Sequence, residues 1–273
     1  MKVPFFHFGG SGPLVHVGHA NSFTPQMYKQ MVEPLLDHFT VVGMEARPLW
    51  PGADMSQVRR WGDLSQDLVR LLDENGWQGV HVIGHSLGAA HILFSALDRP
   101  ELYDKIVLLE PPIVDQWIFN VTKILPMPIL KKVAPPVRVA LNRTTHWPSD
   151  QAFFDYIRPK SVFKGFPDEI LWEYVNSGHF SVEGGVELRY SKEWEAHIYA
   201  ALQSPWRTLK KMHHPTLAIR GAQSDTVSKR SWRKWQQTQK NTEFAEISGG
   251  GHLIPFEQPK AVGERILKYL MEA

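Results

Sequence analysis

Short apolar runs alternate along this chain with longer segments whose apolar residues recur at helical spacing. The short runs are rich in Val, Ile and Leu and mostly lack alternation, as strands buried on both faces of a sheet do. They span residues 5–8, 14–17, 41–44, 80–83, 106–109, 217–219 and 244–247. Only residues 9–13, rich in glycine, separate the first two runs, so the pattern predicts two strands joined by a tight turn.

The clearest helical pattern lies between residues 56 and 75, and Gly76 follows it as a stop signal. Its apolar positions are Val58, Trp61, Leu64, Leu68, Leu71 and Leu72. Further helices are predicted over residues 86–97, 228–239 and 260–271. Strands and helices in this alternation favour an α/β fold with a mostly parallel central sheet flanked by helices.

The alternation breaks between about residues 113 and 204. The stiff pair Pro111-Pro112 precedes this stretch, which contains Pro135-Pro136 and several aromatic helical pieces, without a convincing pair of strands. The strand pattern resumes near Thr216. We therefore expect a core formed by residues 1–112 and 205–273, with residues 113–204 inserted as a helical cap.

Composition narrows the class of protein. The chain has 273 residues and no cysteine, which excludes disulfides, thiolate catalysis and cysteine-based metal sites. Its formal net charge of +2 does not indicate a nucleic-acid-binding face. The N-terminal segment is a poor secretory signal, and no apolar run approaches the length of a membrane span. The default expectation is a cytoplasmic, soluble protein with no metal, no other cofactor and no stable membrane association.

The sharpest chemical signal is Gly84-His85-Ser86-Leu87-Gly88, which directly follows an apolar run and opens a predicted helix. A serine on such a strained turn is exposed above the sheet edge, and the flanking glycines let the two backbones pass. The turn also places the Leu87 N–H at a helix N-terminus, where it can stabilise an oxyanion. The motif predicts Ser86 as a nucleophile.

Two partners for Ser86 follow later strands. Asp225 comes shortly after the strand at 217–219, and His252 follows three glycines after the last strand. Because parallel strands end at one edge of a sheet, the three side chains are expected to converge. We predict His252 as the base and Asp225 as the acid that orients it, although Asp225 could instead cap the next helix.

A further loop, His19-Ala20-Asn21-Ser22, follows the strand at 14–17. An oxyanion hole needs a second N–H beside that of Leu87, and a loop in this position is the usual donor. The N–H of Asn21 is the first choice and that of Ser22 the second. His19, Ser22 and His85 are predicted to contact substrate.

Together these motifs resemble the α/β-hydrolase superfamily, and in particular its cap-bearing bacterial serine esterases, over nearly the whole chain. The matching segments are HAN at 19–21, EARPLWPG at 45–52, GHSLG at 84–88, LEPP at 109–112, RGAQSD at 220–225, GGH at 250–252 and PFEQP at 255–259. Relatives with a carboxylate nucleophile, such as haloalkane dehalogenases and epoxide hydrolases, differ at Ser86. Ala20 also departs from the family's usual glycine, which predicts an altered path for the oxyanion loop.

Glu110 competes with Asp225 for the acid position, because it also ends a strand and some members of the fold place the acid there. Asp225 is preferred on three grounds. Its loop gives it reach, the 220–225 segment matches the superfamily's acid loop, and Pro111-Pro112 stiffens the chain beside Glu110.

The resemblance implies hydrolysis of a small-molecule carboxylic ester with a small to medium acyl chain, through an acyl-serine intermediate. Other serine-triad chemistries remain open: lactone, thioester or carbon–carbon cleavage, or perhydrolysis. A ligand-binding receptor with a slow triad is a second class. A third is a membrane-associated lipase, for which the segment 113–139 offers Trp117, Ile118, Phe119 and Ile129 among Lys123, Lys131, Lys132 and Arg138.

Overall fold

Seven strands form the central sheet, in the order β1-β3-β2-β4-β5-β9-β10. The computed structural model describes residues 2–114, 118–120, 124–125 and 127–272. β1 pairs antiparallel with β3, and the other neighbours are parallel. The strands are β1 (Phe5–Gly9), β2 (Leu14–Gly18), β3 (Thr40–Met44), β4 (Val80–His85), β5 (Tyr103–Leu109), β9 (Thr216–Gly221) and β10 (Thr242–Ile247).

All seven predicted strands are present, and the mostly parallel sheet is confirmed. The first two strands are joined by a short turn, as predicted, but they are not neighbours in the sheet, because β3 lies between β1 and β2. β1 therefore forms an antiparallel edge and not one arm of a hairpin.

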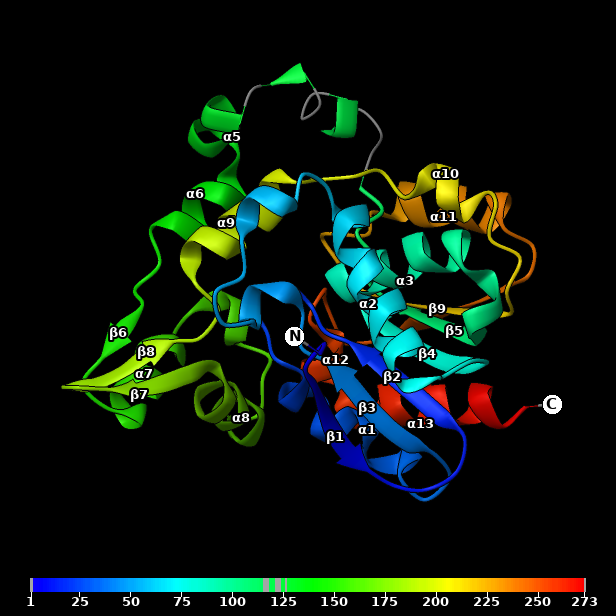
Figure 1. Ribbon diagram of the computed structural model, residues 1–273, viewed down its shortest axis with the longest axis horizontal. Helices are drawn as coiled ribbons and strands as arrows, with labels where there is room; N and C mark the ends of the chain where they lie inside the picture. Colours follow the sequence, from blue (N-terminus) through cyan, green and yellow to red (C-terminus); the bar gives the residue numbers. More distant parts are fainter. Residues whose placement is uncertain (1, 115–117, 121–123, 126, 273) are drawn as a thin grey trace.

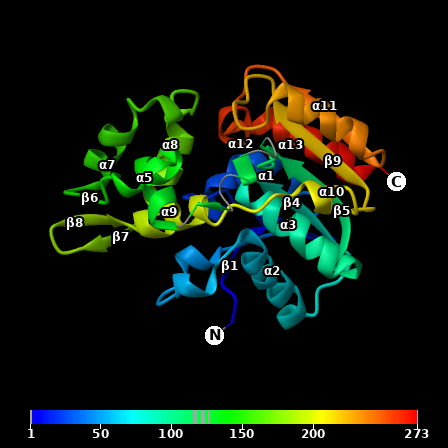
Figure 2. The same ribbon diagram turned by 90° about the horizontal axis from the view of Figure 1, so that it is seen from above.

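Helices cover both faces of the sheet (Figures 1 and 2). Successive strand residues point to opposite faces, so Ile83 and Val107 belong to one apolar cluster while Val82 and Ile106 belong to the other. The first cluster contains residues of α1 (Lys29–Val32) and α13 (Pro259–Met271). The second contains residues of α2 (Trp61–Asn75), α3 (Leu87–Asp98), α10 (Trp206–Leu209) and α11 (Lys229–Thr238).

Short helices complete the core. They are η1 (Pro25–Tyr28), η2 (Glu33–Leu35), η3 (Arg47–Leu49), η4 (Met55–Gln57), η5 (Pro100–Leu102) and α12 (Ile254–Glu257). The predicted helix at 56–75 therefore begins later than expected, at Trp61, after η4. Gly76 ends it in the left-handed conformation, φ +67°, which is the expected stop.

The segment between β5 and β9 forms a cap beside the core (Figure 1). Its helices are α5 (Met127–Val133), α6 (Pro135–Leu141), α7 (Asp150–Ile157), η6 (Ser161–Phe163), α8 (Asp168–Gly178) and α9 (Lys192–Ala200). The cap also holds a three-stranded antiparallel sheet of β6 (His146–Trp147), β8 (Gly185–Leu188) and β7 (His179–Val182). The expectation of a cap without paired strands is therefore wrong. Four-residue strands are too short to show a clear period.

Aromatic side chains join the cap to the core. Phe23 and Phe256 of the core pack edge to face or tilted against Tyr174 and Phe166 of the cap. Many buried residues of the cap, among them Phe153, Leu171 and Tyr174, belong to the same apolar cluster as one face of the sheet. A small separate cluster between α6 and α9 contains Val137, Ala140, Ala196 and Ala200. The cap therefore packs against the core and also has a small apolar cluster of its own.

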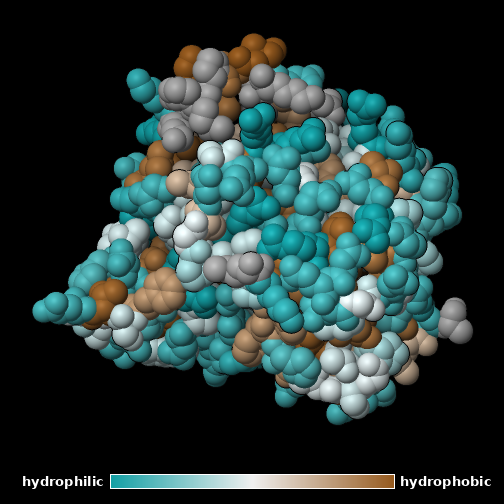
Figure 3. All heavy atoms as spheres, in the orientation of Figure 1, coloured by the Kyte–Doolittle hydropathy of each residue, from teal (hydrophilic) through white to brown (hydrophobic). Residues whose placement is uncertain are grey.

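Figure 3 shows hydrophobic side chains exposed at the top of the molecule. Four of the exposed large apolar side chains lie in α5 and α6 or just before them. They are Ile124, Ile129, Val133 and Val139. Trp117 and Lys123, which contributed to the predicted amphipathic stretch, lie outside the described residues. No helix in the described part of the chain is long and apolar enough to span a membrane.

Candidate active site

Ser86 lies on a sharp turn between β4 and α3 with φ +52° and ψ −111°. This is a conformation that L side chains rarely adopt, and it is held by the surrounding packing. A Cβ on Gly84 would meet the Ala89 backbone at 2.6 Å, and one on Gly88 would meet the Gly18 carbonyl oxygen at 2.2 Å. The glycines therefore permit the close crossing of α3 and β2 that the predicted elbow requires.

His252 lies on the loop between β10 and α12, and its ring faces Ser86. Its Nε2 is 3.0 Å from Ser86 Oγ. Two contacts hold the backbone of this loop. Gly251 N–H donates to Glu257 Oε2 at 2.5 Å, and the His252 carbonyl accepts from His85 Nε2 at 2.9 Å.

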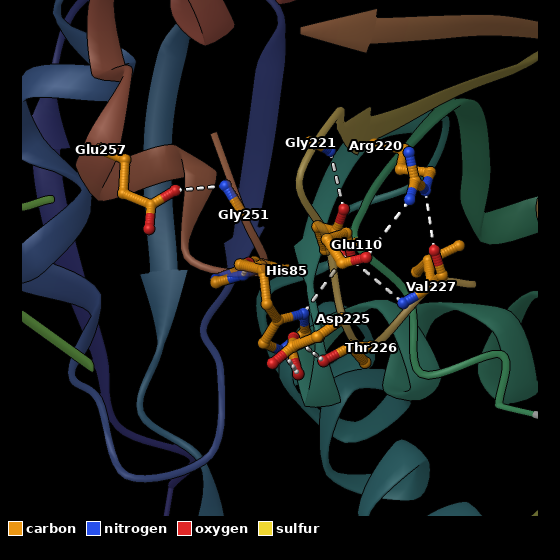
Figure 4. Close-up of polar contacts among 12 residues, drawn as sticks. His85, Glu110, Arg220, Gly221, Asp225, Thr226, Val227, Gly251 and Glu257 are labelled. Atoms are coloured by element: carbon orange, nitrogen blue, oxygen red, sulfur yellow. Dashed lines mark hydrogen bonds and ion pairs between the residues drawn. The ribbon is translucent and has the colours of Figure 1, made fainter. Parts of the chain in front are cut away.

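Glu110, directly after β5, supplies the carboxylate that meets His252. Its Oε2 is 3.2 Å from His252 Nδ1. The side chain is fully buried, and φ of +47° turns the residue out of the strand toward the site. Oε2 also accepts from Ser224 Oγ at 2.6 Å, and Oε1 accepts from the Gly221 N–H at 2.7 Å (Figure 4). Hydrogen bonds of this kind stabilise a buried carboxylate.

The prediction that Asp225 orients His252 is contradicted by this geometry. Asp225 is exposed and accepts a hydrogen bond from Thr226 Oγ1 at 3.3 Å. The stiff Pro111-Pro112 pair, used as an argument against Glu110, instead follows a residue whose position the site requires to be fixed. The helix-cap alternative for Asp225 is not realised either, because Ser228 caps α11.

The loop that carries Asp225 has a different part in the site: it holds Glu110. Arg220 is 1% exposed and donates from Nε to the Val227 carbonyl at 2.7 Å and from Nη2 to the Ser224 carbonyl at 3.2 Å. The Val227 N–H in turn donates to Ser224 Oγ at 3.0 Å. These contacts fix the Ser224 hydroxyl against the carboxylate. Sequence reasoning missed Ser224, although it lies within the 220–225 motif next to the residue that was chosen.

The candidate oxyanion donors lie at the start of α3 and in the loop after β2. In the described residues, neither the Leu87 N–H nor the Asn21 N–H has a protein acceptor. Asn21 and Ser22 are both buried, and the positive φ in this loop, +72°, falls at Ser22 and not at Ala20. Ala20 does not have a positive φ, so an alanine is compatible with the backbone at that position.

Neither His19 nor His85 has a free nitrogen for a substrate, and this corrects the prediction for both. His19 Nδ1 donates to the Ala20 carbonyl at 2.8 Å, and Nε2 accepts from the Ala46 N–H at 2.9 Å. His85 Nδ1 accepts from the Tyr28 hydroxyl at 2.7 Å, while Nε2 donates to the main-chain carbonyl of His252. Burial lowers the pKa of His19 to about 4 and that of His85 to about 3, so both rings are neutral.

Ser22 also has a protein partner. Its Oγ accepts a hydrogen bond from Arg143, which comes from the cap. Arg143 was not singled out in the sequence, because nothing near it in the chain signals a contact with residue 22. Among the described residues, no group of three or more His, Asp or Glu side chains is arranged to hold a metal ion.

Comparison with known proteins identifies the family to which this fold belongs. A sequence model of the alpha/beta hydrolase fold matches residues 14–259. The peroxisomal membrane protein LPX1 of Saccharomyces cerevisiae is 25% identical over 234 residues, which cover 78% of this chain and 59% of LPX1. The putative carbamate hydrolase RutD of Caulobacter segnis is 24% identical over 261 residues, covering 93% of this chain and 87% of RutD.

Among solved structures, the crystal structure of E-2-(acetamidomethylene)succinate hydrolase is similar, with a TM-score of 0.82. The two share 19% sequence identity, and the superposition covers 98% of this chain and 94% of that one. At this identity the likeness concerns the fold.

Proposed function

This chain belongs to the alpha/beta hydrolase family, and from that premise we propose that it is a serine hydrolase that cleaves small-molecule carboxylic esters of small to medium acyl chains. The observation that carries the proposal is the row Ser86–His252–Glu110, joined by contacts of 3.0 and 3.2 Å. A hydroxyl, an imidazole and a carboxylate in this order form a nucleophile, its base and the group that orients the base.

The reaction follows from the donors and acceptors of that row. Glu110 accepts the Nδ1 proton of His252, which leaves the Nε2 lone pair directed at the Ser86 hydroxyl. Ser86 Oγ attacks the ester carbonyl as its proton passes to Nε2. The resulting imidazolium, stabilised by Glu110, then gives that proton to the departing alkoxide. The acyl group remains on Ser86.

Water completes the cycle by attacking the acyl-serine while His252 takes one of its protons. The carboxylic acid leaves, and Ser86 recovers its hydroxyl. In both halves the carbonyl oxygen becomes an oxyanion, for which we assign the N–H groups of Leu87 and Asn21 as donors. Each such donor contributes about 10²- to 10³-fold to kcat in enzymes of this kind.

The names of the relatives favour a second candidate, cleavage of a carbon–nitrogen bond. RutD is described as a putative carbamate hydrolase, and the similar solved structure is of a hydrolase of an acetamido compound. The same row of residues can attack either carbonyl, since the steps differ only in the leaving group. Rates on p-nitrophenyl esters from acetate to palmitate, beside a lactone, a thioester, a carbamate and an amide, separate the candidates.

Ser86→Ala tests the nucleophile. We expect it to fold normally, because the hydroxyl lies on a partly exposed turn, and to lose about 10⁶-fold in kcat, as serine removal does in such triads. Ester hydrolysis is measured on the preferred p-nitrophenyl ester, with circular dichroism as the folding control. Retention of more than about one tenth of the wild-type activity would show that Ser86 is not the nucleophile, since triad loss leaves far less.

A further inference from the structure

The oxyanion loop, residues 20–24, is hydrogen-bonded to side chains and to a main-chain carbonyl of the cap. Asn21 Oδ1 accepts from the Tyr190 hydroxyl at 2.6 Å, and Asn21 Nδ2 donates to the Glu195 carbonyl at 3.2 Å. Thr24 Oγ1 lies 2.7 Å from Ser177 Oγ of α8. The loop that carries a proposed oxyanion donor is therefore bonded to at least three separate segments of the cap.

Arg143 makes the central contact of this set. It follows α6 and reaches the core loop, where it donates from Nη1 to Ser22 Oγ. The same nitrogen donates to Glu195 Oε2 at 2.6 Å, and Nη2 donates to the Tyr174 hydroxyl. The planar guanidinium thus joins α8, α9 and the loop after α6 to a single core residue. A lysine, with one terminal nitrogen, could not reach the same set of partners.

The residue that Arg143 holds is conformationally demanding. Ser22 has φ +72°, a region that L side chains adopt only when their surroundings fix it. Ser22 directly follows Asn21, so a change in the Ser22 backbone redirects the peptide group next to the donor N–H.

A substrate-binding role for Arg143 fits the contacts less well. Its charge is already balanced by Glu195 at 2.6 Å, and 16% of its side chain is exposed. A guanidinium that recognises an anionic substrate would need free donors directed at the ligand, whereas both terminal nitrogens here are bonded to protein.

We propose that Arg143 is a positioning residue, through which the docked cap fixes Ser22 and thereby the Asn21 N–H of the oxyanion hole. The proposal rests on the proposed serine-hydrolase function. It implies that the catalytic site is complete only when the cap is seated, because part of its electrostatic stabilisation is held from the cap side.

Arg143→Met is the principal test, with Arg158→Met as its matched control. Arg158 is also a cap arginine, but it bonds the Phe163 and Phe166 carbonyls and pairs with Asp168, away from the oxyanion loop. We expect Arg143→Met to lower kcat about 10- to 100-fold, less than full removal of an oxyanion donor, and to leave KM within about threefold. Affinity for a trifluoromethyl ketone, whose adduct with serine presents an oxyanion, should fall in parallel. Arg158→Met should remain within about twofold of wild type in both.

Ser22→Ala provides a second variant, because it removes only the acceptor and leaves Arg143 bonded to Glu195 and Tyr174. It should lower kcat in the same direction by a smaller factor. Hydrogen exchange, followed by mass spectrometry on the peptide covering residues 19–24, gives a readout that does not depend on any substrate. Arg143→Met should speed exchange there, and Arg158→Met should not.

These readouts keep the two proposals separate. If the wild type hydrolyses no ester, the proposed function fails, while the exchange rates still decide whether Arg143 holds the loop. A rise in KM for anionic esters with unchanged kcat would overturn the positioning role in favour of substrate binding. Equal effects of the two arginine variants, or unchanged exchange in Arg143→Met, would also overturn it.

Discussion

Two loops at the carboxyl edge of the sheet each offer a carboxylate, and the structure treats them differently. Glu110, after β5, is fully buried, has a positive φ and meets the Nδ1 of His252. Asp225, after β9, is exposed and contacts its neighbour Thr226. Both occupy places from which an acid could reach the histidine of such a fold, so position along the chain does not separate them.

The difference lies in what surrounds each carboxylate. Oxygens of the fully buried Glu110 side chain accept hydrogen bonds from Gly221, Ser224 and His252. A buried charge of this kind is retained only with such partners, and it stabilises an imidazolium far more than an exposed carboxylate does. The loop after β9 supplies two of those partners. The two loops are therefore not alternatives, since one carries the acid and the other holds it.

Replacing each carboxylate with a neutral amide should give the largest difference in kcat between the two positions. Glu110→Gln keeps the shape but loses the charge that stabilises the His252 imidazolium, so kcat should fall about 10³- to 10⁴-fold, near the value for such a change in a serine protease. Asp225→Asn, at an exposed site, should change kcat by less than about threefold. Steady-state kinetics on one ester substrate measure both. The reverse ranking would return the acid to Asp225.

Ser224→Ala sharpens the comparison by removing one donor that holds Glu110. We expect kcat to fall about three- to tenfold, which corresponds to the roughly 1 kcal/mol that one ordinary hydrogen bond contributes. Steady-state kinetics on the same ester measure this loss. Ser228→Ala, which removes the cap of α11 in the same region, is the control. It should lower stability and leave kcat unchanged.

Buried titratable groups also determine how the stability of the fold depends on pH. Burial lowers the pKa of His16, His85 and His91 from 6.5 to about 3. The folded state keeps these rings neutral, whereas the unfolded chain binds protons below pH 6.5. Unfolding is therefore favoured as pH falls from 6.5 toward 3. Each of these rings should make the free energy of unfolding about 2 kcal/mol lower at pH 5 than at pH 7.

Urea denaturation at pH 7 and pH 5 measures this loss. His91→Leu is the matched variant, because His91 is buried and its Nε2 has no hydrogen-bond partner in the described structure. The free energy of unfolding should differ less between pH 7 and pH 5 in this variant than in the wild type, by about the contribution of one ring. An unchanged difference would mean that His91 does not titrate on unfolding.

Much of the fold could be predicted from the sequence because its strands are short Val/Ile/Leu runs with helices between them. The order of the first three strands in the sheet could not be predicted, since the apolar pattern shows which residues are buried but not which strands pair. Ser86 was proposed because the flanking glycines mark a strained turn between a strand and a helix, and His252 because of its place after the last strand. Glu110 was the second choice for the acid because the observations that favour it appear only in the folded structure. Its side chain is buried, its φ is +47°, and its carboxylate accepts hydrogen bonds from residues more than 100 positions away in the chain. His19 and His85 were misassigned for the same reason, since their partners lie far away in the chain.

The rate at which a fluorophosphonate modifies Ser86 tests the central claim most directly, because it reports the activated serine whatever the natural substrate is. We predict that the wild type and Asp225→Asn react at similar rates, with the added mass on the peptide that contains Ser86. Glu110→Gln should react at least about 100-fold more slowly, since its base lacks the charged partner. Slow labelling of Asp225→Asn beside rapid labelling of Glu110→Gln would contradict the assignment of Glu110 as the acid.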